Sequence, residues 1–154
     1  MSRLEPVMKI QADDRSALFS KPSVLVIDDE KRIRDVVIAM LTGEGHAVSG
    51  AENAETGLRM IEGRHFDIIL LDMNFSASVS SGNEGLFWLG EILSIDPGAV
   101  VIMITAYGDI DLAVRSVKEG AAYFIQKPWE PARLIATIQS GIKFRKANVE
   151  LKNL

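Results

Sequence analysis

The sequence contains no cysteine, and this absence excludes two classes of architecture. Without thiols there is neither a disulfide scaffold nor a thiolate metal site, and the chain is expected in the cytoplasm. No apolar stretch reaches about 18 residues, so no membrane span is predicted, and the N-terminus lacks the apolar core of a signal peptide. The net charge of −4 over 154 residues argues against an extensive basic surface for binding nucleic acid.

From Ser23 onward the sequence alternates between apolar runs of strand length and helical patterns. The predicted strands span 24–27, 46–50, 66–71, 99–105 and 122–126. The predicted helices span 30–42, 53–63, 84–95, 109–119 and 130–148. Five strand–helix units in a row predict an α/β domain, with a parallel sheet covered by helices on both faces. Because crossovers are right-handed, few topologies remain.

Both ends of the chain depart from this alternation. Residues 1–22 show no sustained periodicity of apolar residues, and we expect a tail or adaptor there. The last helix first carries a stripe suited to packing on the sheet, formed by Leu134, Ile138 and Ile142. It then follows the 3-4-3 spacing of a short coiled-coil seam at Phe144, Ala147, Leu151 and Leu154. We therefore expect a domain over 23–143, and over 144–154 a further helical segment that belongs to a longer protein.

Carboxylates follow two of the predicted strands. Asp28 and Asp29 come directly after Val24–Ile27, and Asp72 follows Ile68–Leu71. Because the carboxyl ends of parallel strands face one crevice, these side chains would meet and repel one another in apolar surroundings. A hard cation with oxygen ligands, Mg²⁺ or Mn²⁺, would relieve that repulsion.

Two further polar residues stand at the ends of the last two strands, Thr105 and Lys127. Carboxylates for a cation, one hydroxyl and one ammonium suit a phosphoryl group, because the cation and the ammonium balance its oxygen charges. Asp72 is the natural nucleophile, since carboxylates can form acyl phosphates. Taken singly, each residue has an ordinary interpretation as a turn, a helix cap or a strand former. All five in order at successive strand ends favour the phosphoryl site.

At this point the sequence resembles the response-regulator receiver domains of two-component signalling. The resemblance covers Val24 to about Arg145. It rests on four segments, Val24-Leu-Val-Ile-Asp-Asp-Glu30, Ile68-Ile-Leu-Leu-Asp-Met73, Ile102-Met-Ile-Thr-Ala-Tyr-Gly108 and Gly120-Ala-Ala-Tyr-Phe-Ile-Gln-Lys-Pro-Trp129. It implies a doubly wound (βα)5, flavodoxin-like fold with strand order 2-1-3-4-5.

The resemblance assigns roles in the acidic site. Asp72 would accept a phosphoryl group from a histidine kinase. Asp29 would ligate Mg²⁺ directly, and Asp28 mainly through water. The backbone carbonyl of Asn74 would be the third protein ligand, and Lys127 would pair with the phosphoryl group.

The family pattern also marks the residues around that site. Thr105 would swing toward the phosphoryl group, and Ala106 matches the small residue that lets the phosphoryl donor approach. Phe124 matches the aromatic switch position, although an aromatic residue in a strand is most often plain core. Asn74 and Tyr107 occupy two positions that influence how fast the phosphoryl group is lost.

Two local stretches resemble the receivers of NtrC-like activators, namely Thr105-Ala-Tyr-Gly-Asp109 with Ala113-Val114, and Lys127-Pro-Trp129. Such activators carry an AAA+ ATPase and a DNA-binding helix-turn-helix, and act with the enhancer-dependent sigma factor. No Walker motif occurs in these residues, so DNA contact is expected only through a further output domain. The resemblance also implies that residues 144–154 begin a linker helix to this output domain. It further implies a homodimer, formed by the surface of the fourth helix, fifth strand and fifth helix, or by the linker helix.

The loop after Asp72 departs from the family pattern. It has no proline, is several residues longer, and is rich in Ser and Gly up to Gly85. One interpretation is a flexible insertion, since surface loops tolerate length. The other is a lid over the aspartyl phosphate that slows hydrolysis or selects the kinase.

Three other functions compete with this interpretation. A haloacid-dehalogenase-like phosphatase would carry a second Asp two residues after its nucleophile, where this chain has Asn74. A phosphorylation-independent interaction module would need neither the acidic set nor Lys127. A flavodoxin-like nucleotide module would need a Gly-rich loop where Asp28, Asp29 and Glu30 stand. We expect no enzyme activity beyond Mg²⁺-dependent self-phosphorylation and autodephosphorylation.

Overall fold

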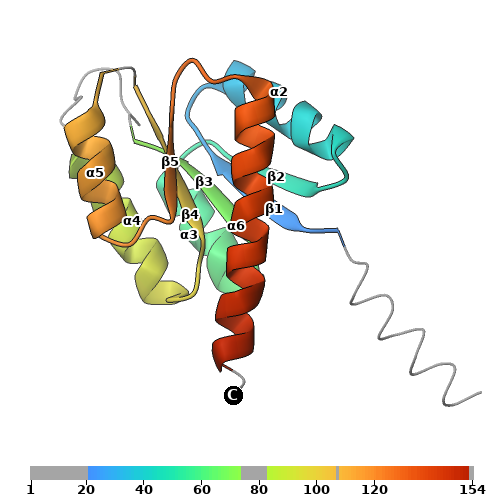
Figure 1. The fold of residues 1–154 in the computed structure, drawn as a ribbon, viewed down its shortest axis with the longest axis vertical. Coiled ribbons are helices and arrows are strands. Elements are labelled where there is room, and N and C mark those ends of the chain that lie inside the picture. The colour runs from blue at the N-terminus through green and yellow to red at the C-terminus, as the bar shows by residue number, and fades with distance from the viewer. Residues whose placement is uncertain (1–20, 74–82, 107, 153–154) are drawn as a thin grey trace, which may run out of the picture.

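The computed structural model describes residues 21–73, 83–106 and 108–152 (Figure 1). The strands are β1 Ser23–Ile27, β2 Ala47–Ala51, β3 Ile68–Asp72, β4 Val101–Thr105 and β5 Tyr123–Gln126. The helices are α2 Lys31–Gly43, α3 Ala54–Gly63, α4 Asn83–Ile95, α5 Ile110–Lys118 and α6 Pro131–Lys152. The predicted alternation is therefore confirmed.

The five strands form one parallel sheet in the order β2-β1-β3-β4-β5, as predicted. The register aligns the carboxyl ends of the two central strands, because Ile27 pairs with Leu71. The residues that follow this pair, Asp28 and Asp72, therefore lie at the same edge. Every residue of β3 and β4 is buried, as expected for central strands covered on both faces.

Side chains alternate between the two faces of each strand and build two separate cores. Along β1, Val24 and Val26 face the core that includes α2 and α6, while Leu25 and Ile27 face the core that includes α3 and α4. Figure 1 shows α6 crossing one face of the sheet, with α4 and α5 on the other side of it. The predicted covering of both faces is confirmed.

Most predicted boundaries agree with the structure within two residues. The strands predicted to begin at 66 and 99 begin later, because Phe66, Ala99 and Val100 are buried apolar residues that precede the paired ladder. The larger difference is at the C-terminus, where α6 continues to Lys152 rather than ending at 148. No proline or glycine follows Gly141 to stop the helix.

The two stripes predicted on α6 have different environments. Leu134, Ile138 and Ile142 are buried against the sheet, as predicted. Phe144 is 49% exposed, and Ala147 is also exposed, so the first two seam positions face away from the core. The side chains of Leu151 and Leu154 lie outside the described residues. In the described ranges, no helix combines the length and apolarity that crossing a bilayer requires.

Two glycines of α4 should respond in opposite directions to the same substitution. A Cβ at Gly85 would lie 2.9 Å from the backbone Cα of Met73, whereas a Cβ at Gly90 would meet nothing within 4 Å. We expect Gly85→Ala to lower the free energy of unfolding by about 1–3 kcal/mol, because backbone cannot yield to overpacking. Gly90→Ala should raise it by about 0.5–1 kcal/mol through helix propensity. Urea unfolding monitored by circular dichroism measures both, and equal effects of the two substitutions would contradict the packing of α4 on β3.

Candidate functional site

Three carboxylates meet at the carboxyl edge of β1 and β3. Asp28, Asp29 and Asp72 each place a carboxylate oxygen within 4.8 Å of the others. Asp28 and Asp72 are buried, whereas Asp29 is exposed. The strand register explains this gathering, since β1 and β3 are neighbours that end at the same level. Three hard oxygen donors at this separation suit a divalent cation such as Mg²⁺.

The Lys127 ammonium reaches into this acidic group from the end of β5. Its Nζ lies 3.2 Å from Asp72 Oδ2 and 3.5 Å from Asp28 Oδ2. The backbone N–H of Lys127 donates to the carbonyl of Thr105 at 2.8 Å, and the peptide bond between Lys127 and Pro128 is cis. The side chain therefore bridges the outer strand of the sheet and its centre.

Burial by itself would lower the pKa of Lys127, but the nearby negative charges, chiefly those of Asp72 and Asp28, together raise that pKa above its usual value of 10.5. The Asp72 hydrogen bond and the charge of Glu30 act in the same direction. The site thus holds a permanent cation beside two buried carboxylates. A doubly or triply negative ligand with oxygen atoms fits such surroundings better than a neutral one.

Thr105 and Phe124 lie near the site, but their side chains are turned elsewhere. Thr105 is fully buried, and its hydroxyl donates to the carbonyl of Ile125 at 3.4 Å. Phe124 is 39% exposed on the edge strand β5, so it is not the buried core aromatic that strand position alone would suggest. It lines an open cavity of about 360 Å³ with Lys127 and Trp129. Ala106 follows directly after β4 and is partly buried.

Residues 24–139 match the family model of the response regulator receiver domain. The chain belongs to this family. Curated relatives of this receiver include the C4-dicarboxylate transport transcriptional regulatory protein DctD of Rhizobium meliloti (strain 1021), which is 30% identical over 137 residues, 89% of this chain and 29% of the relative. The nitrogen assimilation regulatory protein NtrX of Azorhizobium caulinodans is 31% identical over 131 residues, 85% of this chain and 28% of the relative.

Solved structures agree with the family and the fold. NtrX from Brucella abortus superimposes on the receiver with a TM-score of 0.77 at 33% identity, covering 86% of this chain and 29% of that one. A CheY-like receiver domain protein from Methanospirillum hungatei gives 0.74 at 29% identity, covering 83% of this chain and 98% of that one. The chain spans less than a third of the length of the curated relatives named above.

Two contacts that the sequence did not reveal hold Asp28 in place in this receiver. The backbone N–H of Glu30 donates to Asp28 Oδ1 at 2.9 Å. The Arg34 guanidinium, one turn into α2, donates to the Asp28 carbonyl at 2.7 Å. No motif distinguished Arg34 from the other charged residues of this helix, because its role depends on where α2 turns back toward β1. Both contacts restrain the backbone that presents Asp28 and Asp29.

Several predicted features lie outside the described residues. These are the side chain and carbonyl of Asn74, the side chain of Tyr107, the Ser-rich loop over 74–82, and most of the tail predicted over 1–22. The roles predicted for Asn74 and Tyr107, and both interpretations of the loop, therefore remain predictions.

The raised pKa of Lys127 predicts how the stability of the receiver depends on pH. A lysine whose pKa is higher in the folded state stabilises fully below its unfolded value of 10.5, and this stabilisation is lost as the pH rises through the folded value. We expect the difference in unfolding free energy between the wild type and Lys127→Met to be constant from about pH 7 to pH 10 and to shrink above that range. Urea titrations at each pH measure it. A difference that already disappears near neutral pH would show that the ammonium does not pair with the carboxylates.

Proposed function

We propose that this receiver takes a phosphoryl group from a histidine kinase onto Asp72, with Mg²⁺ or Mn²⁺ as cofactor. The observation that carries the proposal is the joint position of Asp28, Asp29, Asp72 and Lys127. Three carboxylate oxygens lie within 4.8 Å of one another, and the ammonium is 3.2 Å from the proposed acceptor. Receiver domains are signalling domains rather than enzymes, and the chemistry proposed here is limited to gaining and losing this group.

The donor set suits the proposed cation. Asp29 and Asp72 would hold it directly and Asp28 through water, with the Asn74 carbonyl as a further ligand from outside the described residues. When bound, a divalent cation would offset the charge of the carboxylates and of the phosphoryl oxygens.

In the proposed transfer, a carboxylate oxygen of Asp72 attacks phosphorus in line. An O–P bond forms, the P–N bond to the imidazole of the donor breaks, and its electron pair leaves with that imidazole. Lys127 is placed to pair with one phosphoryl oxygen, because its ammonium already contacts Asp72. Ala106, at the end of β4, would leave room for the donor.

The structure suggests how the phosphoryl group would be sensed. The Thr105 hydroxyl now donates to Ile125, and a phosphoryl oxygen on Asp72 would be a stronger, charged acceptor for it. Moving Thr105 would release the carbonyl of Ile125 on β5, next to the exposed Phe124. We propose that phosphorylation thereby shifts the balance between two arrangements of the β4 and β5 ends.

The relatives suggest the output. Both curated relatives are regulatory proteins more than three times as long as the region that they share with this chain. We propose that residues 23–143 form the receiver and that 144–154 begin a linker helix to an output domain of the NtrC-like type, which would contact DNA and activate transcription. Exposed apolar residues of α5 (Ile110, Val114 and Val117) support dimer formation through α5, β5 and α6. The exposed Phe144 supports the alternative through the linker.

The proposed function is tested by incubating the chain with acetyl phosphate, with and without Mg²⁺, and then measuring the mass of the intact protein by mass spectrometry. We expect one phosphoryl group per chain with Mg²⁺ and none with a chelator, and peptide mapping should place it on Asp72. Steady turnover of small phosphate esters would support a hydrolase instead. Absence of any uptake would support a phosphorylation-independent interaction module.

A further inference from the structure

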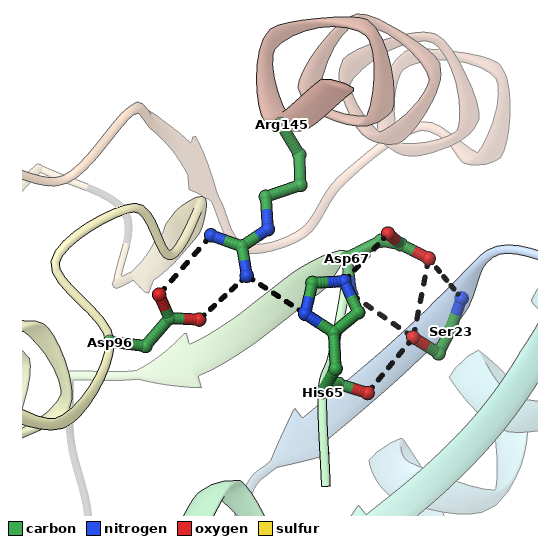
Figure 2. Close-up of polar contacts among 5 residues, drawn as sticks. All are labelled: Ser23, His65, Asp67, Asp96 and Arg145. Atoms are coloured by element: carbon green, nitrogen blue, oxygen red, sulfur yellow. Dashed lines mark hydrogen bonds and ion pairs between the residues drawn. The ribbon is translucent and has the colours of Figure 1, made fainter. Parts of the chain in front are cut away.

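A second polar cluster lies at the edge of the sheet opposite the acidic site, where β1 and β3 begin. We call it the Arg145 cluster (Figure 2), and it consists of Ser23, His65, Asp67, Asp96 and Arg145. These residues come from the first position of β1, the connection between α3 and β3, the turn between α4 and β4, and the middle of α6. Ser23 and Arg145 lie outside residues 24–139, which match the family model, and the proposed chemistry of Asp72 uses none of the five residues.

Arg145 is the centre of the cluster and is only 6% exposed. Its Nη2 lies 2.7 Å from Asp96 Oδ2 and 2.9 Å from His65 Nδ1, and its Nη1 lies 3.3 Å from Asp96 Oδ1. Gly98 makes room for it, because a Cβ there would lie 2.8 Å from Nη1. Among the described residues, the Arg145 Nε has no acceptor. The guanidinium therefore depends on Asp96 and His65 for its polar partners.

The contact with Arg145 determines the protonation state of His65. A guanidinium can only donate, so His65 Nδ1 must accept and carry no proton. The proton of a neutral imidazole is then on Nε2, which donates to Asp67 Oδ1 at 3.1 Å. Asp67 is held in turn by the backbone N–H of Ser23, which donates to its Oδ2 at 2.8 Å. A chain of hydrogen bonds thus runs from the start of β1 to α6 through a neutral histidine.

A second proton on His65 would break this chain at one contact. Protonated Nδ1 would place a donor against the donor of Arg145, and two positive charges would face each other. The charged groups around the imidazole are Asp67, Arg145 and, behind Arg145, Asp96, while Arg64 stacks on the ring of Phe66 at 4.6 Å. The two carboxylates would keep their own partners, so repulsion is concentrated between His65 and Arg145. The His65 side chain is 52% exposed, so protons from solvent reach it.

We propose that the Arg145 cluster is a proton-sensitive latch on α6. With neutral His65, the latch ties α6 to the connection that leads into β3. When His65 takes up a second proton, that tie opens, and Asp96 is then the remaining polar partner of Arg145 among the described residues. Because α6 continues as a helix beyond Arg145 to Lys152, the latch sets the direction in which its last turns project. The proposal does not depend on phosphorylation of Asp72.

The absence of cysteine makes a distance measurement straightforward. Spin labels on Glu62→Cys and Lys146→Cys, both at exposed positions, report the separation of α3 and α6 across the latch. Histidine is the side chain that ordinarily titrates between about pH 5 and pH 8. The distance between the spin labels is therefore measured by pulsed electron paramagnetic resonance near both of these pH values. We expect the distance at low pH to shift by roughly 1–2 Å or more, the scale of helix displacements at switching contacts. A control pair on Glu62→Cys and Arg32→Cys, which does not cross the latch, should not change.

His65→Asn is the decisive variant. Its amide oxygen stands close to the position of Nδ1 and can accept from Arg145, but it takes up no proton in this range. We expect the pH-dependent shift to disappear. Arg145→Ala removes the contacts with both His65 and Asp96, so its distance should not depend on pH. Gly98→Ala, which crowds Nη1, offers a second opening variant in case the Arg145→Ala protein does not fold.

Two results would overturn the latch. One is an unchanged distance in the wild type at both pH values. The other is a shift that persists in His65→Asn, which would assign it to His46, the only other histidine, or to the carboxylates. Neither measurement uses Mg²⁺ or a phosphoryl donor, so failure of the latch and failure of the proposed phosphorylation are distinguishable.

Discussion

Asp72→Asn is expected to abolish phosphoryl uptake from acetyl phosphate in the presence of Mg²⁺. An amide oxygen is not a nucleophile for phosphorus under these conditions, whereas a carboxylate is. Asn keeps the size of the side chain at this buried position, and removing one of two buried negative charges lessens their repulsion. The fold should therefore survive, and loss of labelling would report chemistry rather than unfolding. Intact mass after incubation measures the uptake.

Asp35→Asn is the matched control for this experiment. Asp35 is an exposed carboxylate on α2 that pairs with Lys31 at 2.9 Å, away from the buried acidic pair. Its substitution should leave labelling unchanged. Labelling of the Asp72→Asn protein at another residue would contradict the assignment of the acceptor.

Lys127→Ala is expected to change cation binding and phosphoryl transfer in opposite directions. The Lys127 ammonium lies 3.2 Å and 3.5 Å from the carboxylates that would hold the metal. Removing this competing charge should strengthen Mg²⁺ binding by roughly tenfold, as expected for charges a few ångström apart at partial exposure. The same change should slow labelling by about 10²- to 10³-fold, because a preorganised cation is lost from the charge that develops on the phosphoryl oxygens.

Calorimetric titration with Mg²⁺ and the rate of labelling measure the two effects. Lys31→Ala provides the control, since Lys31 is exposed and pairs only with Asp35 among the described residues. Weaker Mg²⁺ binding in Lys127→Ala would show that the ammonium organises the carboxylates instead of competing with the cation. Unchanged labelling would remove Lys127 from the proposed transfer.

The fold was predictable because its signals are local. Continuous apolar runs such as Ile68–Leu71 mark strands buried on both faces, and the stripe of Leu134, Ile138 and Ile142 marks a helix that packs on them. The acidic site was predictable for a related reason. Parallel strands end at one edge, so chain position alone brings the residues that follow β1 and β3 together.

Side-chain directions within the site were less predictable. Position at the end of β4 places Thr105 near Asp72, but the acceptor of its hydroxyl is the Ile125 carbonyl, which the pairing of β4 with β5 presents. Phe124 resembles a core aromatic by its strand position, yet it is partly exposed because β5 is the edge strand. Strand order and strand pairing, rather than residue type, decided both.

By itself, the sequence determined the alternation of elements, the two-sided core and the edge at which the acidic residues gather, since these follow from local periodicity and strand direction. Only the tertiary structure decided the partners of Arg145. This residue lies 49 positions from Asp96 and 80 from His65, within a stretch whose apolar spacing predicted a coiled-coil seam. A buried guanidinium needs acceptors that no neighbouring sequence supplies. Its environment existed only once α6, the turn before β4 and the connection before β3 had packed together.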